Sequence, residues 1–407
     1  MKVLLINQAF YPDVNATGQY LTDLAEGLAE RGHRMTVIAG DRQYEDPAIR
    51  YQCRETYKGI DIIRIPCTGF GKRTKWMRMV GAMVFQIHLS LKLIFLPKQD
   101  TVVGLTAPPF VACLGLLFCR LKGGKFVYWV MDLNPDEAIT AGWLKEKSFA
   151  ARFLRRLTAW SFAQSDEIVV LDLFMKSRLL EKYHVAHEKI SVIPPWAQSA
   201  LRPIAPQRSL FRQVHGFQNK FVIMYSGNHS PCHPLDSLLA AALYYKGSEQ
   251  VRFCFVGGGL LTRKVSEFKK THGLDSVFQF PYQPLKDLSD CLSAADLHIV
   301  VMGDPYVGII HPCKIYGILA VGRPFIYIGP RQSPIGEVVS RHGVGACVAH
   351  DDVQALIQAI DRSIHSKSSG ALLLAGQESS SFQKTIDLKN SHFSQKKIMA
   401  ELIALIE

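Results

Sequence analysis

Lys314 occupies a position where a cation could meet an anionic ligand. The stretch from Met302 to Pro330 reads as a polar, glycine-containing loop, a helix expected to begin near Pro312, a tight turn and a buried strand. Proline suits the first turn of a helix, because its missing N–H would have no partner there. The free N–H groups of a helix N-terminus attract anions. An anionic ligand would therefore explain Lys314, although an ordinary surface lysine fits the pattern as well.

Three more loops with candidate site residues follow predicted buried strands. They contain Asp132, Gly18, and the group formed by Gly227, Asn228 and His229. Ligands of parallel α/β sheets bind at the carboxyl ends of the strands, where these loops must lie. For Asp132 the alternative is turn chemistry, since Asp and Asn before proline favour turns. Gly18 would allow close backbone approach at a helix start, but it is not part of a GxGxxG fingerprint.

The alternation of strands and helices that positions these loops continues along the whole chain. Such a pattern predicts two parallel α/β domains. The proline-rich segment 192–206 is the best linker, which gives an N-terminal domain over 1–195 and a C-terminal domain over 205–380. Residues 381–407 are expected to form a C-terminal helix that packs back towards the first domain. The Ser/Gly-rich segment 366–381 is expected to be loose.

Composition narrows the classes of partner. The 407 residues carry a formal net charge of +12, which implies an anionic partner such as a phosphorylated small molecule, an acidic membrane surface or nucleic acid. Nine scattered cysteines without a CxxC pair favour reduced thiols in a cytosolic protein. The N-terminus lacks a signal-peptide pattern. His229 and His233 are four apart, but the prolines beside them argue against a helix, so no metal site is predicted.

A long basic and apolar zone spans 61–131, where Asp100 is the only acidic residue between the two ends. Its first part combines these basic and large apolar residues: Arg64, Lys72, Arg73, Lys75, Arg78, Lys92 and Lys98 with Phe70, Trp76, Met77, Met79, Met83 and Phe85. Such a mixture suits the interface of an anionic bilayer. The alternative is a buried helix with a basic edge. Polar residues interrupt the run 79–97, so it is a poor transmembrane candidate.

Motifs taken in order resemble those of retaining glycosyltransferases of family 4. The opening FYPDVNATGQYLTDLAEGLAERGHRMTVI resembles the first loop and helix of that family, and the segment from Ser165 to Pro195 resembles the end of its first domain. YSGNHSPCHPLDSLL, FVGGG and HPCKIYGILAVGRP follow at the positions of its donor domain. Within that family, the motifs resemble those of WbuB-like enzymes of O-antigen, capsule and exopolysaccharide assembly. The resemblance covers nearly the whole chain.

The resemblance implies the GT-B fold, with two Rossmann-like domains facing across a cleft, and a donor that is a nucleotide-diphosphate sugar. It implies no cofactor and no metal. The phosphate-binding residues would be Gly308, Ile309, Ile310, His311 and Lys314, with Gly227, Asn228 and His229, and with Gly18 from the first domain. Asp132 and Lys314 would be catalytic, Asp132 by orienting or deprotonating the acceptor hydroxyl.

The expected acceptor is a polyprenyl-diphosphate-linked glycan, and the expected location is cytoplasmic, peripheral on the inner face of the cytoplasmic membrane. The sequence also departs from the family pattern. Two donor-site glutamates are replaced by Ile309 and Gly317, and the usual Arg and Lys after the SG motif have no clear match.

Other readings remain open at this point. A nucleotide-sugar 2-epimerase uses the same architecture, but it would not need a basic apolar surface. A catalytically silent subunit that partners an active transferase would explain the missing glutamates. Nucleic-acid binding ranks last, because no nucleic-acid motif is present. Neither the base, the sugar, the acceptor, the linkage nor the oligomeric state follows from the sequence.

Overall fold

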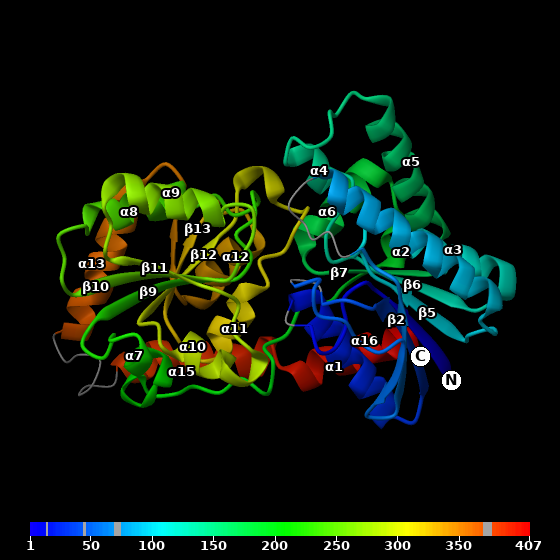
Figure 1. The fold of residues 1–407 in the computed structure, drawn as a ribbon, viewed down its shortest axis with the longest axis horizontal. Coiled ribbons are helices and arrows are strands. Elements are labelled where there is room, and N and C mark those ends of the chain that lie inside the picture. Colours follow the sequence, from blue (N-terminus) through cyan, green and yellow to red (C-terminus); the bar gives the residue numbers. More distant parts are fainter. Residues whose placement is uncertain (14, 44–45, 69–74, 369–376) are drawn as a thin grey trace. The chain divides into compact units, whose positions relative to one another are not determined.

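The computed structural model describes residues 1–13, 15–43, 46–68, 75–368 and 377–407. The chain forms two compact units, and each is built around one parallel sheet (Figure 1). The first unit comprises 1–194, 308–311 and 396–407, and the second comprises 195–307 and 312–395. The division near 194 falls inside the proline-rich segment. Two short segments thus belong to the first unit although they follow residues of the second: 308–311, which lies between two parts of the second unit, and the C-terminal 396–407.

The first unit contains an eight-stranded sheet in the order β3-β4-β2-β1-β5-β6-β7-β8. Its strands are β1 Lys2–Ile6, β2 Arg34–Gly40, β3 Arg54–Tyr57, β4 Ile60–Ile65, β5 Thr101–Gly104, β6 Lys125–Trp129, β7 Glu167–Val170 and β8 Ile190–Val192. All neighbouring strands are parallel except β3 and β4. The apolar residues of β1 are fully buried, as expected of a central strand that is covered on both faces.

The β3–β4 hairpin is an element that the sequence analysis did not predict. Its turn consists of Lys58 and Gly59, both with positive φ (47° and 78°), which matches the right-handed twist of the paired strands. The short, polar sequence of β3 gives no buried face from which an edge strand could be predicted.

Most helices of the first unit lie between successive strands, and one comes from the end of the chain. They are α1 Ala16–Glu30, α2 Lys75–Phe95, α3 Val111–Lys122, α4 Asp136–Thr140, α5 Phe149–Gln164, α6 Leu173–Tyr183 and, from the chain's end, α16 Gln395–Ile406. The predicted cap of α5 is confirmed, because the Ser148 side chain accepts a hydrogen bond from the Ala151 N–H. Within the described residues no helix is both long enough and apolar enough to cross a membrane.

The second unit contains a six-stranded, wholly parallel sheet in the order β11-β10-β9-β12-β13-β14. Its strands are β9 Phe221–Ser226, β10 Val251–Val256, β11 Val277–Phe280, β12 Leu297–Val301, β13 Phe325–Ile328 and β14 Ala346–Val348. This is the doubly wound order in which the chain reverses direction across the sheet between its first and fourth strands. A ligand crevice is therefore expected at the carboxyl ends of β9 and β12.

Helices of the second unit differ from the prediction in two places. They are α7 Leu210–Val214, α8 Asp236–Tyr244, α9 Thr262–His272, α10 Leu288–Ser293, α11 Lys314–Ala320, α12 Pro334–His342, α13 Val353–Ser368 and α15 Gln377–His392. Helix α11 begins at Lys314, two residues after Pro312. Residues 366–368 and 377–381 are helical, so the expectation of a loose segment over 366–381 is wrong at both ends, and 369–376 lie outside the described residues. Helix propensity is a weak preference, and serine does not prevent helix formation.

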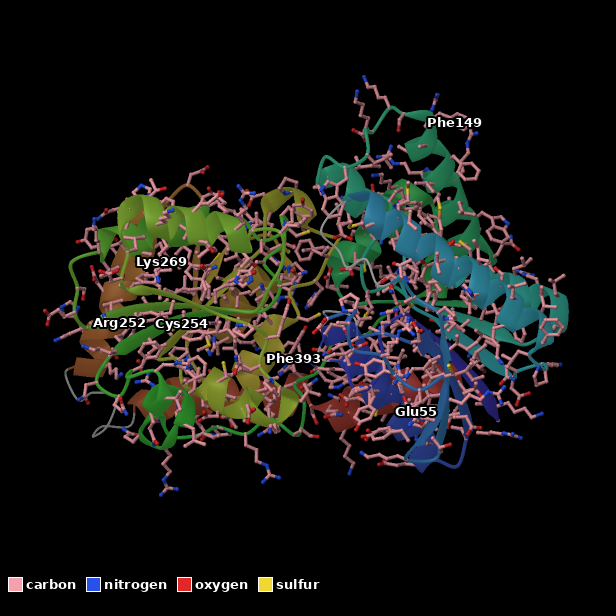
Figure 2. All side chains as sticks on the ribbon, in the orientation of Figure 1. Glu55, Phe149, Arg252, Cys254, Lys269 and Phe393 are labelled. Atoms are coloured by element: carbon pink, nitrogen blue, oxygen red, sulfur yellow. The ribbon has the colours of Figure 1, made fainter. Side chains whose placement is uncertain are left out.

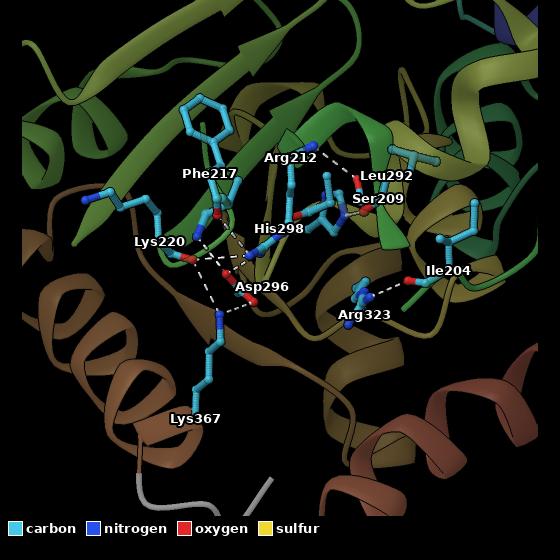
Figure 3. Close-up of polar contacts among 12 residues, drawn as sticks. Ile204, Ser209, Arg212, Phe217, Lys220, Leu292, Asp296, His298, Arg323 and Lys367 are labelled. Atoms are coloured by element: carbon cyan, nitrogen blue, oxygen red, sulfur yellow. Dashed lines mark hydrogen bonds and ion pairs between the residues drawn. The ribbon is translucent and has the colours of Figure 1, made fainter. Parts of the chain in front are cut away.

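A buried ion pair fixes the amino end of this second sheet (Figure 3). Arg212 and Asp296 are almost completely buried, and the Arg212 Nε also donates to the Ala294 carbonyl at 2.7 Å. Asp296 further accepts from the Val222 N–H at 2.8 Å and from Lys367 Nζ at 2.6 Å. This network joins α7, β9 and α13 at the amino ends of the strands. Ligands are expected at the opposite, carboxyl ends, so the role of the network is structural.

Candidate functional site

The loops that follow β9 and β12 meet at the reversal point of the second sheet. The Gly303 N–H, just after β12, donates to the Cys232 carbonyl in the loop after β9 at 2.9 Å. Gly227 begins that loop with a φ of 133°, a conformation that favours glycine. The predicted site residues Gly227, Asn228 and His229 therefore lie where doubly wound sheets bind their ligands.

The glycine triplet after β10 packs directly against this loop. A side chain at Gly257 would overlap the Gly227 carbonyl oxygen, and a Cβ at Gly259 would lie 2.5 Å from Asn228 Oδ1. The His229 N–H donates to the Gly258 carbonyl at 2.8 Å. The triplet thus allows the close approach of a neighbouring loop.

Lys314 reaches the same place from the first turn of α11. Its Nζ donates to the Tyr225 hydroxyl at 2.7 Å and lies 4.1 Å from the centroid of that ring. The Tyr225 hydroxyl in turn donates to the Asn228 carbonyl at 2.8 Å. Burial lowers the pKa of Lys314 from 10.5 to about 7. Within the described part of the chain no carboxylate pairs with this ammonium, so its surroundings would favour an anionic ligand.

Two histidines are buried beside this lysine. His229 is 1% exposed, and both of its ring nitrogens lack a hydrogen-bond partner among the described residues. His233 is 9% exposed, and its Nδ1 likewise has none in that part of the chain. Burial, followed by the charge of Lys314, lowers the pKa of His229 to about 4 and that of His233 well below its usual range. Unpaired buried polar atoms are costly, so a ligand that pairs with them would be stabilised.

Tyr225 and His233 belong to this cluster although the sequence analysis did not propose them. Tyr225 lies near the end of β9, and the signal that could have found it is its place at the carboxyl end of a buried strand. His233 lies in the region where the family's diphosphate-binding Arg and Lys have no clear match, but no role was predicted for it. Among the described residues, no group of three or more His, Cys, Asp or Glu side chains is placed to share one metal ion.

The segment 308–311 groups with the first unit. The Ile309 carbonyl accepts from the Leu133 N–H at 2.9 Å, and His311 Nδ1 lies 2.8 Å from the Asp172 carboxylate. Gly308 has a φ of 71°, and a Cβ there would lie 2.7 Å from the Phe174 carbonyl. Ile310 is buried as well. These four predicted phosphate-binding residues thus belong to the first unit, whereas Lys314 belongs to the second. Their role in phosphate binding stays a prediction.

Asp132 lies in the first unit, three residues beyond the end of β6 rather than immediately after the strand. Its carboxylate is half-buried and has no hydrogen-bond partner among the described residues. Burial and the nearby Glu137 raise its pKa from 3.8 to about 8. By contrast, the Asp136 carboxylate accepts from the Tyr183 hydroxyl at 2.6 Å and pairs with Lys182. The acidic loop therefore separates into a structural Asp136 and a chemically available Asp132.

Gly18 and Gly317 each have a close neighbour at the point where a side chain would begin. The Gly18 N–H donates to Asn15 Oδ1 at 3.1 Å, which caps α1 at the reversal point of the first sheet, and a Cβ there would lie 2.6 Å from that oxygen. A Cβ at Gly317 would lie 3.1 Å from Leu292 Cδ1. A side chain at position 317 would therefore require the end of the Leu292 side chain to move slightly.

Comparisons with known proteins agree with this arrangement. The model of Glycosyltransferase Family 4 matches residues 17–198, and that of Glycosyl transferases group 1 matches residues 220–366. WcaI of Escherichia coli K12, whose name describes it as a putative colanic acid biosynthesis glycosyl transferase, is 25% identical to this chain over 386 residues. The match covers 89% of this chain and 92% of WcaI.

Solved structures give the same fold. WaaG, described as a glycosyltransferase involved in lipopolysaccharide biosynthesis, has a TM-score of 0.73 at 16% identity and covers 99% of both chains. HepE of Anabaena in complex with UDP-glucose has a TM-score of 0.72 at 14% identity and covers 100% of both chains.

The two parallel α/β units and the fold shared with these structures define the GT-B fold, which confirms the predicted fold class. Since the two family models follow one another along most of the chain, the protein belongs to glycosyltransferase family 4.

Proposed function

We propose that this chain transfers a sugar from a nucleoside-diphosphate sugar, with retention of configuration, to a polyprenyl-diphosphate-linked glycan in bacterial surface polysaccharide assembly. The buried cluster of Lys314, Tyr225, His229 and His233 is the observation that carries the donor assignment. The names of WcaI and WaaG support the polysaccharide context, and the UDP-glucose complex of HepE supports the class of donor. A lipid-linked acceptor would place the reaction at the inner face of the cytoplasmic membrane.

The proposed chemistry asks the donor site to stabilise the leaving diphosphate. The bond between the anomeric carbon and the phosphate oxygen breaks, and negative charge develops on that oxygen. An ammonium on Lys314 and an N–H of neutral His229 would bind it in low-dielectric surroundings, where such interactions are strong. We expect no cofactor and no metal requirement, because these groups supply the cationic and donor functions themselves.

The acceptor oxygen forms the new bond to the anomeric carbon. In this proposal Asp132 orients the acceptor hydroxyl or takes its proton, and its raised pKa suits a base that works near neutral pH. Gly18 would let the loop after β1 approach the donor. Gly308, Ile309, Ile310 and His311 would contribute backbone N–H groups.

Replacing Lys314 tests the donor assignment. We expect Lys314→Ala to lower kcat/KM for the donor by roughly 10²-fold, as loss of one group that stabilises an oxyanion typically does. Lys270→Ala, at an exposed position of α9, is the matched control and should leave the kinetics unchanged. Unchanged donor KM and kcat in Lys314→Ala would refute the phosphate-binding role.

A catalytically silent subunit is the second candidate function. The positions of both expected glutamates are occupied by Ile309, which is fully buried, and by Gly317, which packs near Leu292. A silent subunit would bind a nucleoside diphosphate without turnover of any donor and acceptor pair, whereas the proposed transferase turns over. Product analysis with a panel of nucleotide sugars separates the two.

A further inference from the structure

The outer side of α2 carries an apolar stripe in place of the usual polar surface. Phe85, Leu89 and Leu93 point into the core, as expected of a helix that covers a sheet. The other side bears exposed Met83, Ile87, Leu91, Ile94 and Phe95, and Phe95 is 83% exposed. Solvent-facing helix surfaces are normally charged or polar. Contiguous exposed apolar side chains of this kind mark an interaction surface.

Polar side chains of α2 are turned back onto the protein backbone. The Ser90 hydroxyl donates to the Gln86 carbonyl at 2.8 Å, and His88 Nδ1 lies 2.8 Å from the Val84 carbonyl. Gln86 Nε2 donates to the Pro109 carbonyl at 2.7 Å. The exposed stripe can therefore enter an apolar phase without leaving these groups unpaired.

Helices α3 and α5 extend the same kind of surface. α3 contacts both α2 and α5. Leu121 of α3 is 76% exposed and Phe149 of α5 is 77% exposed, and Figure 2 shows Phe149 projecting from the start of its helix. Phe149, Phe153 and Trp160 recur at one-face helical spacing.

Basic side chains hold these three helices together. Lys122 Nζ donates to the Ile94 carbonyl at 2.7 Å and to other carbonyls at the end of α2. Arg120 Nη2 donates to the Gln164 carbonyl at the end of α5 at 2.9 Å. We call the resulting surface the α2–α3–α5 face; it is formed by Met83, Ile87, Leu91, Ile94, Phe95, Leu117, Leu121, Phe149, Phe153 and Trp160.

The charge of the α2–α3–α5 face is one-sided. None of the three helices contains Asp or Glu, whereas α1 of the same unit contains Asp23, Glu26 and Glu30. Arg152 and Arg156 are exposed on α5 beside its aromatic residues. The exposed Glu146 that precedes α5 is paired with Arg155 at 2.8 Å. Apolar side chains with arginines and no acids complement an anionic lipid surface.

We infer that the α2–α3–α5 face inserts its apolar side chains into an anionic bilayer while the protein lies on the surface. The sequence placed such a surface within 61–131, and the structure adds α5, which lies outside that range. Of the residues named for that zone, Phe70, Lys72 and Arg73 lie outside the described residues, as do the side chains of Lys75, Trp76 and Arg78. The inference does not depend on the donor site.

Flotation of the full chain with lipid vesicles tests the inference. The protein should float with phosphatidylglycerol-containing vesicles and much less with pure phosphatidylcholine. The variant Phe95→Ser/Leu121→Ser/Phe149→Ser should weaken partitioning roughly tenfold or more, because exposed large apolar groups are removed without loss of core packing. The control Leu210→Ser/Val214→Ser removes side chains that are 65% and 76% exposed on α7 and should float like the wild type.

Charge and self-association give the remaining outcomes. Arg152→Glu/Arg156→Glu should reduce flotation with anionic vesicles. Equal recovery with neutral and anionic vesicles, or equal flotation of the triple variant and the wild type, would overturn the inference. So would a wild-type dimer that the triple variant converts to a monomer, with no flotation of either. The triple variant should bind nucleoside diphosphates as the wild type does. A flotation result that overturns the inference would then leave the proposed function unaffected.

Discussion

Lys314 is a cation whose free energy depends on what occupies the site. Its ammonium donates a hydrogen bond to the Tyr225 hydroxyl, and burial lowers its pKa to about 7. A bound diphosphate would raise that pKa again, since opposite charges favour the ionised form. The residue would then be charged when the donor is bound and partly neutral when the site is empty.

Donor binding should therefore take up protons. At pH 8.5 a lysine with a pKa near 7 is mostly neutral, so binding of a nucleoside diphosphate should add up to about one proton per site. Calorimetry in two buffers of different ionisation enthalpy measures this uptake. Lys314→Met should abolish it, while Lys270→Met should not. Equal uptake by wild type and Lys314→Met would assign the proton to another group.

Asp132 should lower stability as the pH rises. Its folded pKa of about 8 exceeds its usual 3.8, so the folded state binds more protons between these values and stability falls across that window. Asp132→Asn removes this cost, which is absent below about pH 4 and complete above about pH 8. We expect the variant to raise the melting temperature at pH 8, by on the order of 2–4 °C for each kcal/mol regained, and by less at pH 5.

Thermal denaturation at both pH values makes this measurement. Asp275→Asn, at an exposed position, is the control. A melting temperature of Asp132→Asn that is lower than wild type at pH 8 would contradict the account. Loss of transferase activity together with that gain in stability would be the pattern expected of a functional carboxylate.

At the scale of single residues, the sequence predicted what loop position alone can reveal. Gly227, Asn228, His229 and Lys314 were proposed because they follow strands or begin a helix, and the structure brings them together. Tyr225 could not be proposed in this way, since a tyrosine in an apolar strand looks like core. The pairing of His311 with Asp172 joins residues far apart in the sequence, and no local pattern predicts such contacts.

At the scale of elements, hydrophobic runs and breakers predicted most of the fold. Continuous apolar strands such as β1, β9 and β12 need no partner information to be recognised. Helix α11 was placed two residues early, because proline preference favours Pro312 while residues 308–311 pack with the first unit. The β3–β4 hairpin was missed, since an edge strand with exposed polar residues carries no buried pattern.

The Arg212–Asp296 pair should be the strongest single support of the second sheet. Removing the arginine leaves Asp296 with Lys367 and one backbone N–H, in a buried place. Arg212→Ala should lower stability by about 3–5 kcal/mol, as typical for breaking one side of a buried pair. Chemical denaturation measures the loss, and Arg263→Ala, in an exposed pair on α9, should show no measurable change. Equal midpoints for the two variants would show that the pair is not a support.

At the scale of the whole molecule, the net charge of +12 is unevenly distributed. Part of it lies in the acid-free helices α2, α3 and α5, and part is the buried Lys314 of the second unit. The composition implies an anionic partner. The structure offers two separate places that could bind one, the α2–α3–α5 face and the buried cluster around Lys314. The contribution of α5 was not predicted, because its alternation of arginines with Phe and Trp looks like an ordinary amphipathic helix in sequence.

The proposed function depends on a donor site at the reversal point of the second sheet. A thermal-shift screen with UDP, GDP, ADP and dTDP, with and without magnesium, tests it most directly. Ligand that binds only the native state at 100 times its Kd stabilises by about 2.7 kcal/mol. We predict a selective rise in melting temperature with one of the four, independent of magnesium, that Lys314→Met loses and Lys270→Met keeps. No rise with any of them, or an equal rise in Lys314→Met, would contradict the account.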